Sequence, residues 1–184
     1  MIIGIEGGLG SGKTLLMVRY LFKDAEKDYN IYSNFSLKGI KHKPLDVMEI
    51  LKLDKDDTHL DDVSIGIDEI TVFMDCRTSM SKANRILSYF ILQTRKRNVT
   101  LYYTTQDITM VDKRLEKYTD IRIVADKIYK EDGEAIENLR KYTIFDLRDR
   151  RNFKMVKFVL DITKYYDYYN TNQVILPPTM FNDS

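Results

Sequence analysis

The sequence predicts an α/β domain built on a mainly parallel sheet. Three observations favour it: short β-branched runs recur along the chain, helical patterns stand between them, and a glycine cluster joins the first run to the first helix. Sheets of this kind bind ligands at the carboxyl ends of their strands. The chain has 184 residues, enough for one domain, and we expect a single domain over residues 1–184. Within it we expect a core at 1–126, a hairpin extension at 127–164 and a tyrosine-rich tail at 165–184.

Five strands are predicted from short apolar runs that stop at glycines, acids or polar residues. They span residues 2–6, 31–35, 63–67, 99–105 and 121–125. Two further runs, at 142–147 and 153–160, are separated by charged residues and are expected to form a terminal hairpin. Helices are predicted where apolar residues recur at spacings of three and four. They span 13–27, 82–97 and, as a short helix, 111–118.

Composition excludes several classes of protein. The 29 basic and 28 acidic side chains give a net charge of +1, so no overall electric field marks a polyanion or an anionic membrane as the partner. Cys76 is the only cysteine, which excludes an intrachain disulfide and fits a reducing compartment. No apolar run reaches the length of a membrane span, and no basic region precedes the apolar N-terminus. We therefore expect a cytoplasmic chain without direct membrane insertion.

The glycine cluster matches a phosphate-binding motif. Residues 7–14 read Gly-Gly-Leu-Gly-Ser-Gly-Lys-Thr and fit the P-loop pattern G-x-x-x-x-G-K-[ST], after a predicted strand and at the start of a predicted helix. Glycines let backbone N–H groups turn around phosphate oxygens, and the helix N-terminus adds unpaired donors. The lysine adds charge at the terminal phosphates, and the threonine hydroxyl is a magnesium ligand. The expected nucleotide-binding residues are Gly7, Gly8, Leu9, Gly10, Ser11, Gly12, Lys13 and Thr14.

Two acids after a buried strand are expected to complete a site for ATP and Mg²⁺. Asp68 and Glu69 directly follow the run 63–67, so both should emerge at the sheet edge where the P-loop lies. We expect Asp68, with Thr14, to hold the magnesium, and Glu69 to activate the attacking water as general base. Gln106 ends the next strand along the chain. Its amide is predicted to sense the γ-phosphate.

This combination resembles the additional-strand, RecA-like P-loop NTPases. In those proteins a glutamate stands beside the metal-binding aspartate and a polar residue ends the next strand. The resemblance implies a mainly parallel sheet of order 5-1-4-3-2, with the strands numbered along the chain. A GTPase is disfavoured, because Asp126 and Lys127 do not fit the base-reading motif N-K-x-D and no other stretch does.

Several stretches look more narrowly like the FtsK/HerA branch of P-loop ATPases. They are residues 68–77, 79–82, 93–97 and 103–106. Over 1–126 the chain is similar to the viral genome-packaging ATPases and the zonular-occludens-toxin-like ATPases of archaeal and bacterial viruses. The resemblance implies a ring-forming, usually hexameric motor that hydrolyses ATP to translocate DNA. Zonular-occludens-toxin-like proteins usually carry a transmembrane segment beyond the ATPase core, and its absence from this sequence disfavours a role in membrane export.

The resemblance also implies an arginine finger, supplied by one subunit to the site of its neighbour. Such a guanidinium must stand at the active edge of the neighbour's sheet. The helix predicted over 82–97 leaves that edge, so its last arginines should lie at the far end of the subunit. Arg77 starts near the active edge and is the expected catalytic finger, with Arg114 as second choice.

Local charge favours double-stranded DNA as a partner. Residues 77–106 hold six basic side chains and no acid, and residues 140–157 hold seven basic side chains against two acids. Such patches suit DNA phosphates, and binding should weaken steeply with salt. The alternative is that these bases are solvated or pair between subunits with the acidic stretch 41–69.

Four tyrosines lie at the start of the tail. They could stack on bases, but the expected role is to pack the tail onto the body or onto a neighbouring subunit. They are Tyr165, Tyr166, Tyr168 and Tyr169.

Taken together, the sequence predicts an ATPase that moves DNA, most simply one that packages a viral genome in the host cytoplasm. Its expected partners are double-stranded DNA, further copies of itself in a hexameric ring, and a capsid or membrane-associated virion protein. One alternative is a zonular-occludens-toxin-like ATPase for virion assembly or export. Another is a small-molecule kinase, although the pair Asp68 and Glu69 with Gln106 favours water as acceptor. A third is an assembly protein that uses ATP only as a switch.

Overall fold

The computed structural model describes residues 1–45, 62–72, 91, 99–149, 151–152 and 154–170. Among these residues, eight strands form one sheet in the order β3-β2-β4-β5-β1-β6-β7-β8. The strands are β1 (Ile2–Glu6), β2 (Asn30–Ser33), β3 (Lys43–Pro44), β4 (Val63–Ile67), β5 (Val99–Thr105), β6 (Ile121–Tyr129), β7 (Ala135–Asp146) and β8 (Lys154–Asp161). The helices are α1 (Lys13–Ala25) and α4 (Lys113–Tyr118), with 3-10 turns η1 (Ile70–Val72), η3 (Ile108–Met110) and η4 (Thr163–Tyr168).

The parallel half of the sheet has the strand order expected from the sequence. β1 pairs in parallel with β5 and β6, and β4 pairs in parallel with β2 and β5. The five predicted strands are β1, β2, β4, β5 and β6, and their order β2-β4-β5-β1-β6 is the predicted order read from the other edge. The prediction of a mainly parallel α/β sheet is therefore confirmed. The short β3 adds a strand beside β2 that the patterns did not indicate.

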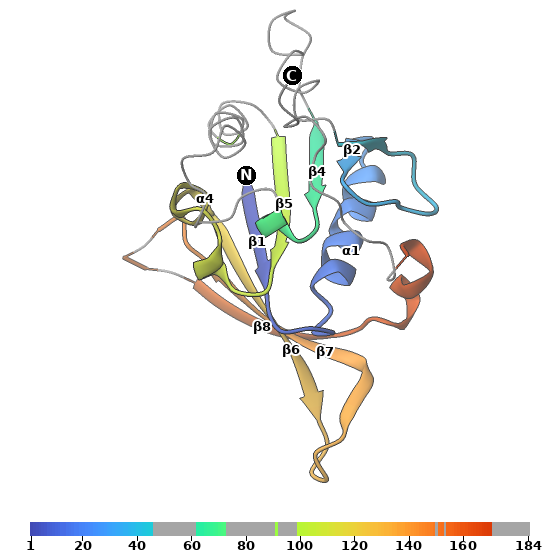
Figure 1. Ribbon diagram of the computed structural model, residues 1–184, viewed down its shortest axis with the longest axis vertical. Coiled ribbons are helices and arrows are strands. Elements are labelled where there is room, and N and C mark those ends of the chain that lie inside the picture. Colours follow the sequence, from blue (N-terminus) through green and yellow to red (C-terminus); the bar gives the residue numbers. More distant parts are fainter. Residues whose placement is uncertain (46–61, 73–90, 92–98, 150, 153, 171–184) are drawn as a thin grey trace, which may run out of the picture.

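The antiparallel half is larger than the predicted hairpin. β6 continues to Tyr129 instead of ending at 125, and β7 begins at Ala135 instead of 142. β6, β7 and β8 thus form an antiparallel meander, and the β6–β7 turn projects from the rest of the described chain (Figure 1). Few side chains are buried along the outer part of this ribbon, so the sequence there lacks the long apolar runs that mark a strand.

The helices differ from the predictions mainly at their ends. α1 ends at Ala25, and the short helix predicted from 111 begins at Lys113, after η3. Asp112 is its N-cap, and the Asp112 carboxylate accepts a hydrogen bond from the backbone N–H of Arg114. The helix predicted over 82–97 lies outside the described residues except for Ile91, which is helical and buried. None of the helices formed by the described residues has the length and apolarity needed to cross a bilayer.

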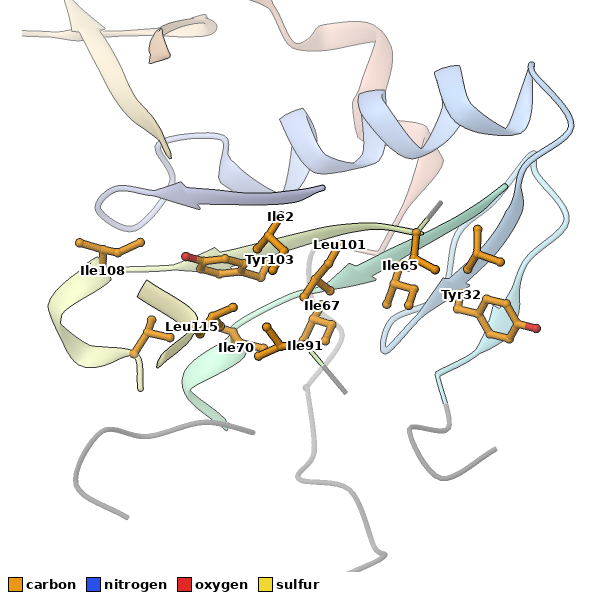
Figure 2. Packing of buried hydrophobic residues seen from close by; sticks show 13 residues of the cluster. Ile2, Tyr32, Ile65, Ile67, Ile70, Ile91, Leu101, Tyr103, Ile108 and Leu115 are labelled. Atoms are coloured by element: carbon orange, nitrogen blue, oxygen red, sulfur yellow. The ribbon is translucent and has the colours of Figure 1, made fainter. Parts of the chain in front are cut away.

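Hydrophobic residues fill both faces of the parallel sheet. On one face the side chains of β4 and β5 pack against η1, Ile91 and Leu115 of α4, as Figure 2 shows. On the opposite face α1 covers the sheet, with Leu16, Met17 and Leu21 in the same cluster as Ile5. Because both faces are covered, the strand ends remain as the part of the sheet open to ligands.

The described start of the tail, residues 165–170, packs onto the body, as expected. The Tyr165 side chain is buried with Leu15 of α1, and the Tyr168 ring stacks on Phe22 with 4.2 Å between centroids. The backbone N–H of Lys38 donates to the Tyr168 carbonyl at 2.7 Å. η4 therefore runs beside α1, close to the carboxyl edge of the sheet (Figure 1).

Candidate functional site

The P-loop turns between β1 and α1 in a conformation that requires glycine. Gly7 has φ of 148° and Gly12 has φ of 88°, in the region that side chains rarely adopt. A Cβ on Gly7 would lie 2.3 Å from the Ala125 carbonyl oxygen, and one on Gly12 would lie 2.7 Å from Tyr142 Oη. The loop is therefore packed against β6 and β7, and the motif predicted from the sequence adopts a tight turn at a helix N-terminus.

Lys13 is the first residue of α1, and its side chain reaches back to the loop. Its side chain is buried, and its Nζ donates to the Gly8 carbonyl at 3.2 Å. A buried ammonium group held by the loop itself is placed to receive the negative charge of a phosphate. This is the position that the motif predicted for a phosphate-binding lysine.

Thr14 and Asp68 meet across the sheet edge. Thr14 Oγ1 donates to Asp68 Oδ1 at 2.8 Å, although the two residues are 54 positions apart in the sequence. A hydroxyl and a carboxylate are the oxygen ligands that Mg²⁺ takes beside nucleotide phosphates. The donor set at this point therefore fits Mg²⁺, and Thr14 and Asp68 are the residues that would hold it.

Two residues that sequence reasoning missed fix the position of Asp68. Asn34, just after β2, forms two hydrogen bonds with the main chain of Asp68. Its Nδ2 donates to the Asp68 carbonyl at 2.9 Å, and its Oδ1 accepts from the Asp68 N–H at 2.8 Å. Thr104 Oγ1 donates to Asp68 Oδ1 at 2.6 Å. The β4–β5 register pairs Ile67 with Tyr103, which places Thr104 beside Asp68.

Glu69 adopts an unusual backbone conformation. Its φ of 49° is left-handed, and its N–H donates to Thr104 Oγ1 at 2.9 Å. Non-glycine residues in this region concentrate at functional sites, where the surroundings enforce the strain. Burial raises the pKa of Glu69, the nearby Lys13 charge lowers it, and the Asp68 charge raises it again. The net result is a carboxylate more basic than a solvated one.

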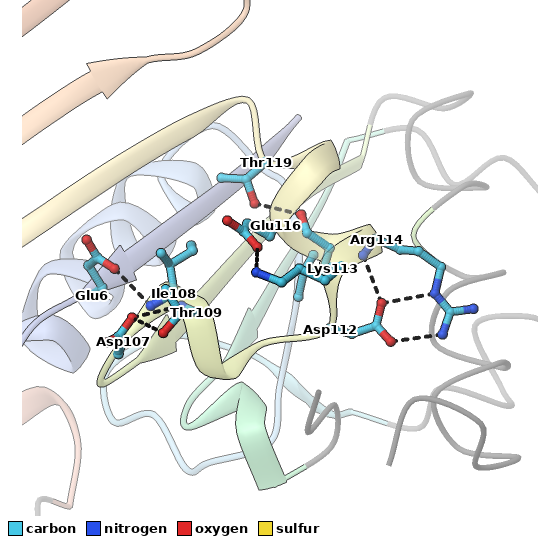
Figure 3. Close-up of polar contacts among 10 residues, drawn as sticks. Glu6, Asp107, Ile108, Thr109, Asp112, Lys113, Arg114, Glu116 and Thr119 are labelled. Carbon is cyan, nitrogen blue, oxygen red and sulfur yellow. Dashed lines mark hydrogen bonds and ion pairs between the residues drawn. The ribbon is translucent and has the colours of Figure 1, made fainter. Parts of the chain in front are cut away.

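The other predicted site residues are less closely joined to these. Gln106 is exposed just beyond the end of β5, and it does not line the cavity at the P-loop, so its role as γ-phosphate sensor stays a prediction. Arg77 lies outside the described residues. Arg114 is held by its own chain, because Nε and Nη2 both donate to the Asp112 carboxylate at 2.9 Å. Figure 3 shows this pair on α4.

The loop after β5 is fixed to β1. The buried carboxylate of Glu6, at the end of β1, accepts from the N–H of Ile108 at 2.9 Å, and Arg122 Nε donates to the same carboxylate at 2.7 Å. Asp107 caps η3 through its bond from the N–H of Thr109 at 2.8 Å (Figure 3). The segment that follows the predicted sensor is therefore held at the same sheet edge.

A cavity of about 500 Å³ opens at this edge, within the size range of small-molecule sites. Seven of the predicted site residues line this one cavity: Leu9, Gly10, Gly12, Lys13, Thr14, Asp68 and Glu69. Its remaining wall comes from α1, the segment after β2, η1, β7, η4 and the two residues that follow η4. The polar lining residues of this wall that sequence reasoning missed in this role are Arg140, Tyr166, Tyr169 and Asn170.

Tyr169 stands beside the proposed metal ligands. Burial and the Asp68 charge raise the pKa of its phenol and a hydrogen bond with Thr14 lowers it, with the net effect that the pKa is raised to about 12. Its ring meets Phe35 edge-on, with 6.2 Å between centroids. Composition marked this tyrosine as a packing residue, and only the folded chain shows that it packs at the cavity.

Comparison with solved structures shows a P-loop ATPase fold. The N-terminal domain of zonular occludens toxin from Neisseria meningitidis has a TM-score of 0.61 at 19% identity, covering 92% of this chain and 98% of that chain. B204, the DNA-packaging ATPase from Sulfolobus turreted icosahedral virus, has a TM-score of 0.54 at 16% identity, covering 84% of this chain and 95% of that chain. At these identities the likeness establishes the fold. No protein-family model and no curated protein matches the sequence.

A third similar structure contains a nucleotide. The genome-packaging NTPase B204 from Sulfolobus turreted icosahedral virus 2, in complex with AMP, has a TM-score of 0.57 at 13% identity, covering 86% of this chain and 98% of that chain. The same protein was also solved with ATP-γS. The resemblance to packaging and zonular-occludens-toxin-like ATPases expected from the sequence is thus confirmed as structural similarity.

Proposed function

We propose that this chain is an ATPase that binds MgATP and hydrolyses it at the P-loop edge of the sheet. The observation that carries the proposal is the hydrogen bond of 2.8 Å between Thr14 Oγ1 and Asp68 Oδ1, with Glu69 on the same cavity. It brings a phosphate-binding loop, an oxygen pair suited to Mg²⁺ and a basic carboxylate together. The nucleotide complexes of the structurally similar B204 support the choice of ligand.

The residues of the chain divide the chemistry between them. Glu69 accepts a proton from the water whose oxygen attacks the γ-phosphorus, while the bond from that phosphorus to the bridging oxygen of ADP breaks. ADP and inorganic phosphate are the products. Lys13 stabilises negative charge on the phosphate oxygens, and the P-loop N–H groups hold them in place. Mg²⁺ held by Thr14 and Asp68 would supply further positive charge to those oxygens.

The finer proposal is an additional-strand, RecA-like motor that forms a hexameric ring and translocates double-stranded DNA, as in viral genome packaging. Three observations support it: the FtsK/HerA-like sequence stretches, the strand order, and the similarity to a protein described as a genome-packaging NTPase and DNA-packaging ATPase. Within this proposal Gln106 senses the γ-phosphate and Arg77 enters the site of the neighbouring subunit. A capsid or membrane-associated virion protein would dock the ring.

A zonular-occludens-toxin-like ATPase for virion assembly or export is the second candidate. The observation that favours it is the similarity to the N-terminal domain of zonular occludens toxin, which covers 98% of that chain. Both candidates hydrolyse ATP at the same site. They differ in whether DNA is the moved substrate.

Phosphate release by the full chain tests these proposals. It is measured with and without double-stranded DNA at several salt concentrations, beside the oligomeric mass with nucleotide bound. Release that DNA stimulates and salt suppresses supports packaging, whereas release that DNA does not change supports the assembly ATPase. Turnover far below about one per second even with DNA supports an ATP switch, and phosphate transfer to nucleosides supports a kinase. A chain without affinity for MgATP contradicts all of them.

A further inference from the structure

Arg140 is a buried arginine that makes no ion pair with an acid in the described part of the chain. Its residue surface is 8% exposed. Its guanidinium donates to main-chain carbonyls: Nε to Gly10 at 3.0 Å, and Nη1 to Ile136 at 2.9 Å and to Glu137 and Leu139 at 2.8 Å. Carbonyl oxygens satisfy N–H groups but carry only partial charges. The positive charge of the Arg140 side chain is therefore not neutralised by a carboxylate among these residues.

A buried ion without a counter-ion is costly, because the protein interior solvates charge poorly. The cost falls when a bound anion supplies the missing charge, and the planar guanidinium matches the oxygens of a phosphate. Arg140 lines the same cavity as Lys13. Two buried cationic side chains thus stand on one cavity, each tied to a carbonyl of the P-loop.

The alternation of side chains along strand β7 places Arg140 at this cavity. Tyr142, two residues further on, points to the same face and donates from Oη to the Gly12 carbonyl at 2.9 Å. A Cβ on Gly12 would lie 2.9 Å from Arg140 Cγ. The arginine therefore packs directly against the last glycine of the P-loop, on the side facing the cavity.

We propose that Arg140 binds a phosphate group of the nucleotide held by its own subunit. The inference rests on the proposed ATPase site and adds to it a ligand from the antiparallel extension. It differs from the arginine finger of a ring, because Arg140 reaches the cavity within one chain. A single subunit should therefore bind nucleotide through two buried cations, Lys13 and Arg140, whether or not a neighbour is present.

Calorimetry of ADP and ATP binding to the full chain tests this role. The variants are Arg140→Gln, which removes the charge, Arg140→Lys, which keeps it, and Lys27→Gln, which removes one exposed charge outside both basic stretches as a control. We expect Arg140→Gln to weaken binding about 10- to 100-fold and to flatten its salt dependence. Arg140→Lys should recover part of the affinity, and Lys27→Gln should behave as wild type. The melting temperature of the ligand-free Arg140→Gln protein is measured as well, because this variant loses an uncompensated buried charge and also four bonds to main-chain carbonyls.

The outcomes separate this inference from the proposed function. Wild-type affinity in Arg140→Gln overturns the inference and leaves the ATPase proposal standing, whereas a wild-type protein without nucleotide affinity overturns both. Weaker binding with a lower melting temperature and no rescue by lysine would mean that Arg140 only braces the loop, which contradicts the inference. If Arg140→Gln does not fold, a crystal structure of the wild type with a non-hydrolysable ATP analogue decides. An Arg140 guanidinium within hydrogen-bonding distance of a phosphate oxygen supports the inference. A guanidinium that contacts no phosphate oxygen contradicts it.

Discussion

Thr104 donates a hydrogen bond to Asp68, from Oγ1 to Oδ1 at 2.6 Å, and the same hydroxyl accepts one from the N–H of Glu69 at 2.9 Å. One buried side chain of β5 thus orients the proposed metal ligand and fixes the backbone of the proposed base. Both acids follow β4, so their relative positions depend on the neighbouring strand as well as on their own. Thr104 is therefore a positioning residue for two functions at once.

Replacing Thr104 by Val should slow turnover while ATP binding is kept. The methyl group cannot donate to Asp68, so the acid loses a partner that orients it. Loss of such a partner beside a metal site costs about 10- to 100-fold in activity. Steady-state phosphate release measures this, with Thr104→Ser expected to restore most of the rate. Thr100→Val, on the same strand but near its other end, is the matched control, and equal losses in the two variants would contradict the role of Thr104.

Glu69→Gln should bind ATP and fail to hydrolyse it. Glutamine keeps the size of the side chain but cannot accept the proton of the attacking water, and a general base contributes about 10²- to 10⁴-fold. Single-turnover phosphate release and nucleotide affinity are measured together. Glu134→Gln, at the turn between β6 and β7, serves as control. Unchanged turnover in Glu69→Gln would remove this residue from the mechanism.

Lys13→Ala should abolish turnover and weaken nucleotide binding. The buried ammonium group is held by the Gly8 carbonyl, at the loop that would bind the phosphates. Lys23→Ala removes an exposed lysine from the same helix and should leave both properties unchanged. Nucleotide affinity by calorimetry and phosphate release are the measurements. Retained turnover in Lys13→Ala would show that ATP is not hydrolysed at this loop.

Asp112→Ala should destabilise the fold in a pH-dependent way. The Asp112 carboxylate caps α4 and pairs with Arg114, and loss of an N-cap costs about 0.5–2 kcal/mol. The hydrogen bond from Arg114 lowers the pKa of Asp112 below its ordinary value of 3.8. Its stabilising contribution is therefore complete above that ordinary value and is lost as the pH falls through the lowered pKa.

Urea unfolding of the wild type and Asp112→Ala across this acidic range measures the effect. The difference in unfolding free energy should be full at neutral pH and shrink as Asp112 becomes protonated. A difference that stays constant with pH would show that the carboxylate charge plays no part.

The parallel half of the fold could be predicted because its signals are local. β1, β4 and β5 are buried on both faces and read as short runs rich in β-branched and aromatic residues, and the P-loop marks where the first of them ends. The length of the β6–β7 ribbon could not be predicted in the same way. Its outer residues are exposed or only half-buried, so their pattern resembles that of a loop.

The candidate site was predictable where one segment carries the chemistry and not where strand pairing does. The P-loop and the pair Asp68 and Glu69 are contiguous in the sequence. Thr104 and Asn34 reach Asp68 through the register and order of three strands, which no single window of sequence contains. Arg140 was counted only as part of a basic stretch, because nothing in that stretch shows that its side chain is buried.

The attachment of the P-loop to β7 connects the projecting ribbon to the loop. Gly10 and Gly12 are tied to Arg140 and Tyr142, and these sit on the strand that runs out to the β6–β7 turn. A force that bends this ribbon must either move the P-loop with it or break those hydrogen bonds. A load applied at the far tip would therefore reach the P-loop cavity through these two hydrogen bonds.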